Sequence, residues 1–312
     1  MNENMRIVGH SLAWITILMW GMTFISTKLL LEVISPVEIL FMRFLIGFIA
    51  LCLLSPLQLK LTEWKHEWYF AAAGVCGVTL YFLLENIALT YTFASNVGVI
   101  VSIVPFFTAL LAHFVLDGEK LSRRFFAGFA VALVGVFLIS FNGNYHFQLN
   151  PFGDLLAVLA AAVWAIYSVL MKKIGSFPYG TVQATRKIFF YGLLFMLPIL
   201  VISGFKPNWS SLMQPLPLFH LLFLGLGASA LCFVTWNSAV KLLGAVKTSV
   251  YIYVVPVITV VASSIILKEK ITVAVVIGTL LALVGLILSE YKFDIVRSKK
   301  ESNIGSRIEA EG

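Results

Sequence analysis

Charged side chains are scarce in this sequence, and their scarcity excludes a water-soluble fold. Asp, Glu, Lys and Arg make up 12% of the 312 residues, whereas about 25% is usual in soluble domains. The length would otherwise suggest about two domains, but so few charges cannot solvate two globular surfaces. With 60% hydrophobic residues, the composition predicts a membrane protein.

Sequence signs of catalysis and metal binding are also missing. The three cysteines, Cys52, Cys76 and Cys232, lie within apolar runs and lack metal-site spacing. There is no His pair with an acid at helical spacing, no Gly-x-Ser-x-Gly elbow and no phosphate-binding Gly loop. We therefore expect no enzyme activity, no cofactor and no metal ion, with an intramembrane enzyme as a remote alternative.

Other protein classes fit no better. The net charge of +7 comes from Lys and Arg dispersed between apolar runs and gathered in the tail, so we expect no nucleic-acid partner. The first apolar run continues through Leu31 without a cleavage site, which indicates a spanning helix instead of a secretory signal. A sensor would need a soluble output domain, and the apolar segments leave no room for one.

Long apolar segments fill the chain instead. A membrane helix needs about 20 mostly apolar residues, and ten such segments follow one another with short connections. We expect spans at about 8–31, 36–57, 67–90, 95–116, 123–141, 153–173, 179–203, 217–240, 246–267 and 271–291.

The positive residues predict the orientation of these spans. Most Lys and Arg of the connections and the tail fall on the side of the N terminus, whereas Lys206, Lys268 and Lys270 fall on the other side. Because cytoplasmic loops are enriched in Lys and Arg, we expect both termini in the cytoplasm.

The second half of the chain repeats the first. The run from Trp20 to Lys28 returns as Trp164 to Lys172, and further residues match in the same order. The matched pairs are Arg43 with Arg186, Gly74 with Gly225, Asn86 with Asn237, Pro105 with Pro256, Glu119-Lys120 with Glu269-Lys270, and Gly128 and Gly135 with Gly278 and Gly285.

This repeat predicts an all-α polytopic membrane protein made of two five-helix units. We expect repeats at 1–145 and 146–291, followed by a polar cytoplasmic tail at 292–312 that is disordered. Because five is odd, the second unit enters the membrane from the opposite face. Inverted repeats are typical of secondary transporters, whose substrate site lies near the midplane between the halves.

With these residues in view, the chain resembles the EamA-type transporters of the drug/metabolite transporter superfamily, across everything except the tail. The resemblance implies a ten-helix exporter of small metabolites, often amino acids, driven by an ion gradient or by the substrate's own gradient. The second copy departs from the first at Ala165 and Ser168, where the first has Gly21 and Phe24. The resemblance rests on the Trp-Gly-x-x-Phe-x-x-x-Lys run at Trp20–Lys28, on Arg43, Pro105, Gly118-Glu119, Gly128 and Gly135, and on Trp164, Lys172, Arg186, Pro256, Glu269, Gly278 and Gly285.

Glu85 is the most notable ionisable residue within a predicted span. A charge at the centre of a membrane helix costs at least about 2.5–3.5 kcal/mol, so such a residue usually faces a cavity or a partner. Glu85 could bind a proton or a substrate ammonium, or it could form a structural ion pair with Lys28 or Arg43. The second copy has Trp236 at the matching position, which favours a one-sided role.

Four cations within the spans are candidates for gating or ion pairing. Lys28 and Lys172 lie near helix ends, where a Lys can either reach the headgroups or act as a gate. Arg43 and Arg186 lie deeper, and each could clamp backbone carbonyls or a carboxylate, or contact the substrate. For Arg43 the expected carboxylates are Glu38 and Glu85.

Polar and aromatic residues near the midplane predict a substrate cavity. Trp20 and Trp164 lie about midway along their helices, where a stacking face with a polar edge suits an amphiphilic or cationic substrate. The full set of predicted cavity residues is Trp20, Thr23, Tyr81, Glu85, Asn86, Asn96, Ser102, Trp164, Tyr167, Trp236, Asn237, Thr248 and Tyr251.

Prolines and glycines at matched positions predict helix shape. Pro105 and Pro256 lie mid-helix, so each should kink its helix, and the kinks either shape the cavity or serve packing alone. The small residues Gly128, Gly135, Gly278 and Gly285 allow close helix approach, which indicates a scaffold pair or a homodimer contact.

We therefore predict a multi-pass secondary transporter of the cell membrane that exports small organic metabolites, amino acids or related amphiphiles, by alternating access. The expected partners are the lipid bilayer, the substrate and coupling protons. Lys28, Arg43, Arg186 and Lys187 could instead neutralise phosphates, so a carrier of anionic metabolites such as nucleotide sugars or sugar phosphates is the alternative.

Overall fold

The computed structural model describes residues 3–56, 59, 62–115, 123–141, 150–269 and 271–290. The predicted tail, the 142–149 connection and the Glu119-Lys120 pair lie outside these residues. Within them the chain is almost entirely helical, and no strand occurs. The prediction of an all-α membrane fold is confirmed, because eight helical spans of the described chain are long and apolar enough to cross a membrane.

The first half of the chain forms seven α-helices and one π-helical segment. Their bounds are α1 (Glu3–Leu30), α2 (Pro36–Leu54), α3 (Lys65–Gly74), the π-helix η1 (Val75–Leu80), α4 (Tyr81–Tyr91), α5 (Ala94–Val101), α6 (Val104–Val115) and α7 (Arg123–Phe141).

The second half repeats this order, with two additional short elements, α10 and η3. Its elements are α8 (Pro151–Gly175), α9 (Thr181–Ser203), the short α10 (Trp209–Leu212), α11 (Pro215–Leu222), the π-helix η2 (Phe223–Leu231), α12 (Cys232–Leu243), α13 (Ala245–Ser249), the 3-10 helix η3 (Val250–Val254), α14 (Val255–Ile266) and α15 (Val273–Glu290). The sequence analysis did not predict α10.

Local sequence signals account for several helix ends. Ser35 caps α2 in a reciprocal capping box with Glu38, and Pro36 occupies the first turn, where its missing amide costs nothing. Asn150 caps α8 in front of Pro151 in a similar way. After α9 and α12, Gly204 and Gly244 adopt positive φ angles of 67° and 94°, which suit glycine.

Four of the predicted spans are not single regular α-helices. The span at Lys65–Tyr91 contains the π-helical segment η1, and the span at Pro215–Leu243 contains η2 at the corresponding place. The spans at Ala94–Val115 and Ala245–Ile266 are interrupted directly before Pro105 and Pro256, which stand in the first turns of α6 and α14. These prolines therefore coincide with interruptions of the regular α-helix within their spans.

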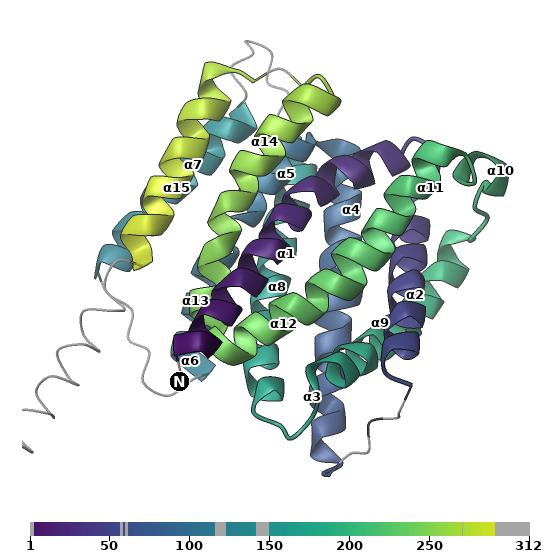
Figure 1. Ribbon diagram of the computed structural model, residues 1–312. Helices are drawn as coiled ribbons and strands as arrows, with labels where there is room; N and C mark the ends of the chain where they lie inside the picture. Colours follow the sequence, from purple (N-terminus) through teal and green to yellow (C-terminus); the bar gives the residue numbers. More distant parts are fainter. Residues whose placement is uncertain are drawn as a thin grey trace, which may run out of the picture.

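The packing of the helices is repeated between the halves. In the bundle α1 packs along α12 and α8 packs along α4, which is the same contact with the halves exchanged. The same holds for the contact of α2 with η2 and that of α9 with η1. Helices α7 and α15 lie side by side at one edge of the bundle, and α5 packs against α14 beside them (Figure 1).

Glycines bring α7 and α15 into backbone contact. A Cβ added to Gly135 would lie 2.4 Å from the carbonyl oxygen of Gly278, and one added to Gly285 would lie 2.4 Å from that of Gly128. All four predicted scaffold glycines are thus buried in one contact within the chain.

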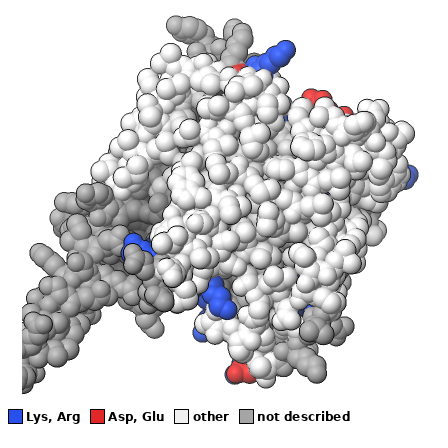
Figure 2. All heavy atoms as spheres, in the orientation of Figure 1, with Lys and Arg blue, Asp and Glu red and all other residues white. Residues whose placement is uncertain are grey.

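The outer surface suits a lipid environment. Many large apolar side chains are exposed, among them Leu53, Phe114, Val201, Ile202 and Val273. On the face shown in Figure 2, the charged side chains lie towards the two ends, and the described residues across its broad middle carry none. Such a surface is costly in water and favourable in a bilayer.

Candidate functional site

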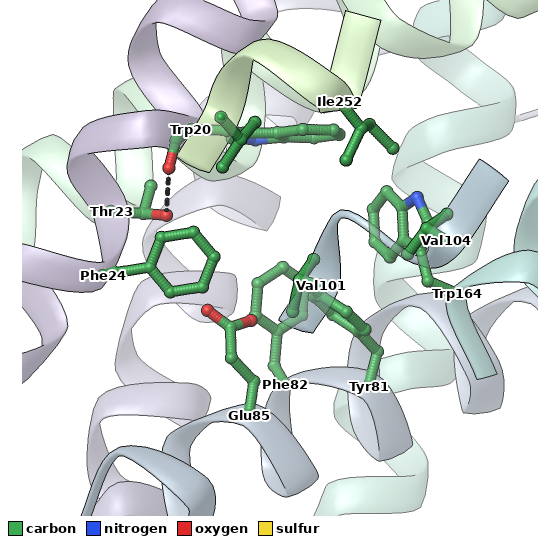
Figure 3. A pocket seen from close by; sticks show the side chains of 11 residues that line it. Trp20, Thr23, Phe24, Tyr81, Phe82, Glu85, Val101, Val104, Trp164 and Ile252 are labelled. Carbon is green, nitrogen blue, oxygen red and sulfur yellow. Dashed lines mark hydrogen bonds between the residues drawn. The ribbon is translucent and has the colours of Figure 1, made fainter. Parts of the chain in front are cut away.

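A small cavity of about 30 Å³ lies between the two halves of the bundle. Its wall is mostly aromatic and aliphatic, and helices of both halves contribute to it (Figure 3). The lining residues are Trp20, Thr23 and Phe24 from α1, Tyr81, Phe82 and Glu85 from α4, Val101 from α5, Val104 from α6, Trp164 from α8, Ile252 from η3 and Val255 from α14.

Five of the predicted cavity residues are in this wall, namely Trp20, Thr23, Tyr81, Glu85 and Trp164. The other lining residues, such as Phe24 and Phe82, are apolar and were not predicted. Nothing in their own chemistry distinguishes them from the many other apolar residues of the chain. The only available signal was position, since Phe24 follows Trp20 by one helical turn.

Glu85 brings a carboxylate to the cavity. Its side chain is 1% exposed, and its Oε2 atom is buried with no hydrogen-bond partner among the described residues. In Figure 3 the carboxylate points into the space between Phe24 and Phe82. A buried carboxylate oxygen without a partner is costly unless a ligand or proton satisfies it.

Arg43 lies behind this wall. It is fully buried on α2, and its Nε donates a hydrogen bond to Ser229 Oγ at 3.0 Å. Its guanidinium carbon lies 4.3 Å from the centre of the Phe82 ring and 5.3 Å from that of Phe44. The two Nη atoms have no hydrogen-bond partner among the described residues.

Arg43 and Glu85 attract each other electrostatically, but no ion pair within 4.0 Å joins these two described side chains. Glu38, the other carboxylate expected near Arg43, is engaged elsewhere. It accepts hydrogen bonds from the amides of Ser35 at 2.8 Å and Lys206 at 3.1 Å. The guanidinium of Arg43 therefore interacts with the rings of Phe44 and Phe82. Glu85, in contrast, lines the cavity.

The indole rings form a cluster at the cavity. Trp20 packs edge-on against Trp164 with ring centres 5.2 Å apart. The ring centre of Trp236, which does not line the cavity, lies 5.0 Å from that of Trp20. Trp20 Nε1 donates to the carbonyl of Ala228 at 3.1 Å. The Nε1 atoms of Trp164 and Trp236 are buried without an acceptor among the described residues, so the site offers an unused donor at Trp164.

The remaining polar residues of the predicted cavity lie outside this wall and join helices instead. Tyr167 donates to Asn237 Oδ1 at 2.9 Å, and Asn237 Nδ2 donates to Thr185 Oγ1 at 2.9 Å, which links α8, α12 and α9. In the first half, Asn86 Nδ2 donates to the carbonyl of Pro36 at 3.1 Å.

The other polar residues of the predicted set form hydrogen bonds within their own span or with a neighbouring helix. Asn96 donates to Thr92 Oγ1 at 3.2 Å, Ser102 to the carbonyl of Val99 and Thr248 to that of Gly244. Tyr251 shares a hydrogen bond with His10 Nδ1.

Three of the four predicted gating cations lie towards the ends of their spans, whereas Arg43 is buried within α2. Lys28 donates to the backbone carbonyls of Leu89 and Thr92, and Arg186 donates to that of Ser55. Lys172 lies in the last turn of α8. Near Arg186, Lys187 forms an ion pair of 2.9 Å with Glu67. None of these cations lines the cavity.

Metal chemistry finds no support in the described chain, because no group of three or more His, Cys, Asp or Glu side chains there could hold a metal ion. The cavity wall combines several aromatic faces, an apolar remainder and one carboxylate, whose Oε2 lacks a hydrogen-bond partner among the described residues. Aromatic faces and a carboxylate are groups that attract an ammonium ion, and apolar side chains suit the apolar part of an amphiphile.

Sequence comparisons connect this architecture to known proteins. The EamA-like transporter family model matches the chain twice, at residues 7–141 and 151–291. An uncharacterized transporter of Archaeoglobus fulgidus is 30% identical over 294 residues, which cover 91% of this chain and 97% of that protein. The transporter YvbV of Bacillus subtilis is 28% identical over 292 residues, with 93% and 92% covered.

Two more distant matches concern function and fold. A protein of Streptantibioticus cattleyicolor named a probable terminal-alkyne amino-acid exporter is 25% identical, with 94% of this chain and 96% of that protein covered. A crystal structure with 19% identity superposes with a TM-score of 0.64 and covers 93% of this chain and 98% of its own, which indicates a shared fold. With both halves matched by one family model, the chain belongs to the EamA-like transporter family and is a membrane transporter instead of an enzyme.

Proposed function

We propose that this protein is a secondary transporter of the cell membrane that exports small amphiphilic organic compounds bearing an amino group, such as amino acids and related compounds. The substrate binds in the central cavity, with its ammonium group at Glu85 and its apolar part against the aromatic rings. Alternating access moves it from the cytoplasm to the outside.

The observation that carries this proposal is the buried carboxylate of Glu85 in an aromatic wall, where Oε2 has no hydrogen-bond partner among the described residues. A membrane protein tolerates a buried charge where it serves a pathway or a partner. Here Arg43 forms no ion pair with it, and Oε2 has no partner among the described residues. A substrate ammonium would satisfy the carboxylate and stack against Trp20, Tyr81 or Trp164.

The proposed architecture has ten spans in two inverted repeats, 1–145 and 146–291, with both termini in the cytoplasm. Helices α7 and α15 supply the two spans beyond the eight long ones. The exchange of helix contacts between the halves supports a two-fold arrangement. The interrupted helices at Pro105 and Pro256 supply matched elements that could hinge, as broken helices do in inverted-repeat transporters.

The cavity wall favours this substrate class over anionic metabolites. Glu85 is the one acid or base among the lining residues apart from the weakly acidic Tyr81, and no Lys or Arg of the described chain lines the wall. A phosphate group would meet a carboxylate there and no cation. The name of the Streptantibioticus cattleyicolor relative, an amino-acid exporter, agrees with the proposed class.

The function is tested by comparing the compounds released by cells with and without the protein. We expect the medium of producing cells to be enriched in one or more amino-bearing amphiphiles, and their intracellular levels to fall. Enrichment confined to phosphorylated metabolites would reject the proposed substrate class. An unchanged profile across amino acids, amines and phosphorylated metabolites would contradict export.

The inverted arrangement is tested by thiol labelling of the connection between the two repeats. A cysteine at Asn150, in a background without the three natural cysteines, should react with a membrane-impermeant reagent from the outside. A cysteine in place of Ser176, at the other end of α8, should react from the cytoplasm. Labelling of the Asn150 position from the cytoplasm alone would contradict the inversion.

A further inference from the structure

The corner between α4 and α5 is held from two sides by charged groups of other helices. On one side is Lys28, near the end of α1. Its Nζ donates to the carbonyl oxygens of Leu89 at 2.5 Å and Thr92 at 2.9 Å, at the C-terminal end of α4. A cation is favourable there because the last carbonyls of a helix lack partners and carry partial negative charge.

On the other side is Glu269, which follows α14 in the second half of the chain. Its Oε1 accepts from the amide of Ala94 at 3.1 Å, and its Oε2 accepts from that of Ser95 at 3.3 Å. These amides begin α5, whose own N-cap residue, Phe93, supplies no side-chain cap. Glu269 therefore gives α5 the anionic cap that its sequence lacks.

The backbone before Glu269 is shaped for this contact. Lys268 has φ = 55° and is the one non-glycine residue of the described chain with a positive φ. This conformation is uncommon for a residue with a Cβ. It follows directly after α14, so an unusual turn delivers the carboxylate of Glu269 to the start of α5.

Lys28 and Glu269 also attract each other, and both line one hollow of about 540 Å³ at this end of the bundle. Glu32 lines the same hollow and adds a second negative charge near Lys28. Its carboxylate makes no hydrogen bond or ion pair with any described residue. Lys28 and Glu269 are therefore held by hydrogen bonds to the backbone of the corner. Glu32 acts on Lys28 through electrostatic attraction alone.

The helices joined at this corner are the helices of the cavity wall. Helix α1 contributes Trp20 and Thr23 to the cavity, α4 contributes Glu85, α5 contributes Val101 and α14 contributes Val255. The two charged groups thus tie four wall helices together between the cavity and the face at which α1 ends. Opening the cavity towards that face requires these helices to separate there.

We propose that Lys28 and Glu269 form a latch that holds the cavity closed towards this face and releases in each transport cycle. The proposal rests on the alternating-access function proposed above. Because the hollow is open, water can solvate both charges when the latch releases, which keeps the cost of opening small. The latch joins the two halves of the chain, since Glu269 belongs to the second half and α5 to the first.

The latch is tested by the accessibility of the cavity, which needs no substrate. A Thr23→Cys reporter, in a background without the three natural cysteines, is treated with a small membrane-impermeant thiol reagent from each face separately. We expect Glu269→Gln and Lys28→Met each to raise the labelling rate from the face at which α1 ends about tenfold, since each removes hydrogen bonds to a charged group.

Glu32→Gln is the matched control, because it removes a carboxylate from the same hollow without removing a hydrogen bond. Its labelling rate should equal that of the parent. Parent-like rates in both Glu269→Gln and Lys28→Met would overturn the latch, as would an equal increase from the opposite face. Because the assay reports accessibility alone, the latch can fail while export stands, and export can fail while the latch stands.

A covalent lock that replaces the contact of Glu269 with the start of α5 tests the same proposal from the opposite direction. Phe93→Cys and Glu269→Cys place two thiols in the hollow, where a short cleavable cross-linker can join them. We expect cross-linking to stop export of the substrate found in the release comparison and cleavage of the linker to restore it. Full export by the cross-linked protein would overturn the proposal.

Discussion

Replacing Glu85 with glutamine is expected to weaken substrate binding about 10- to 100-fold, because a charged hydrogen bond contributes about 1.5–3 kcal/mol. The amide keeps the size of the carboxylate but cannot carry a negative charge. In the wild-type protein a proton and an ammonium group compete for one carboxylate, so transport should depend on pH and fall in acid. In Glu85→Gln this dependence should disappear, while binding remains measurable at higher substrate concentration.

The measurement is substrate uptake into inverted vesicles over a range of pH. Glu67→Gln is the matched control, because it alters a carboxylate of the same span that contacts Lys187 and Tyr191 and does not line the cavity. We expect that control to keep the wild-type pH profile. A Glu85→Gln variant with unchanged pH dependence would contradict the assignment of Glu85 as the carboxylate for which a proton and the substrate compete.

Placing leucine at Gly285 is expected to separate α7 from α15. A Cβ there would lie 2.4 Å from the backbone nitrogen of Ala132 and from the carbonyl oxygen of Gly128, and backbone atoms cannot move aside as a flexible side chain can. Overpacking typically costs about 1–3 kcal/mol, so we expect the thermal midpoint to fall by roughly 2–10 °C. Since neither helix lines the cavity, the folded fraction should keep its substrate affinity.

Gly175→Ala is the matched control for this substitution. A Cβ at Gly175 would find its nearest neighbour, a side-chain carbon of Lys241, at 3.6 Å, which is an ordinary contact. Its thermal midpoint should stay close to that of the wild type. If Gly285→Leu were equally stable, the close approach of α7 and α15 would not be a scaffold of the fold.

Much of the architecture follows from sequence patterns that act over whole helices. The apolar segments of about 20 residues located the helices to within a few residues, as at 123–141, which α7 reproduces. The order of matched residues, such as Asn86 with Asn237, indicated two related halves. These features depend on length, hydropathy and spacing, which a single sequence displays directly.

The irregular parts of the spans were harder to predict. The π-helical segments η1 and η2 have no proline and no break in hydropathy, so apolar periodicity treats them as ordinary helix. Pro105 and Pro256 signalled a disturbance, but a proline alone cannot distinguish a kink from an interruption. That outcome depends on whether neighbouring helices supply hydrogen-bond partners for the backbone groups that the proline leaves without one.

The site residues also fall into those that the sequence indicated and those that depend on tertiary contacts. The sequence indicated Glu85, Trp20 and Trp164 because a charge or a polar indole edge near the membrane midplane is costly unless it faces a cavity or a partner. Asn86 and Asn237 stood out equally, yet the structure uses both to join helices, since tertiary contact decides which polar group faces a cavity. Glu269 could be matched to Glu119 by sequence, but its role as a cap on α5 depends on a distant segment.

The central claim is that the substrate occupies the cavity between Trp20, Glu85 and Trp164. It is tested most directly by substrate protection of the Thr23→Cys reporter against thiol labelling. The account predicts that the exported compound slows labelling, with half-protection at the concentration that half-saturates transport, and that Glu85→Gln shifts both concentrations upward together. Efficient transport with no protection at any substrate concentration would contradict it.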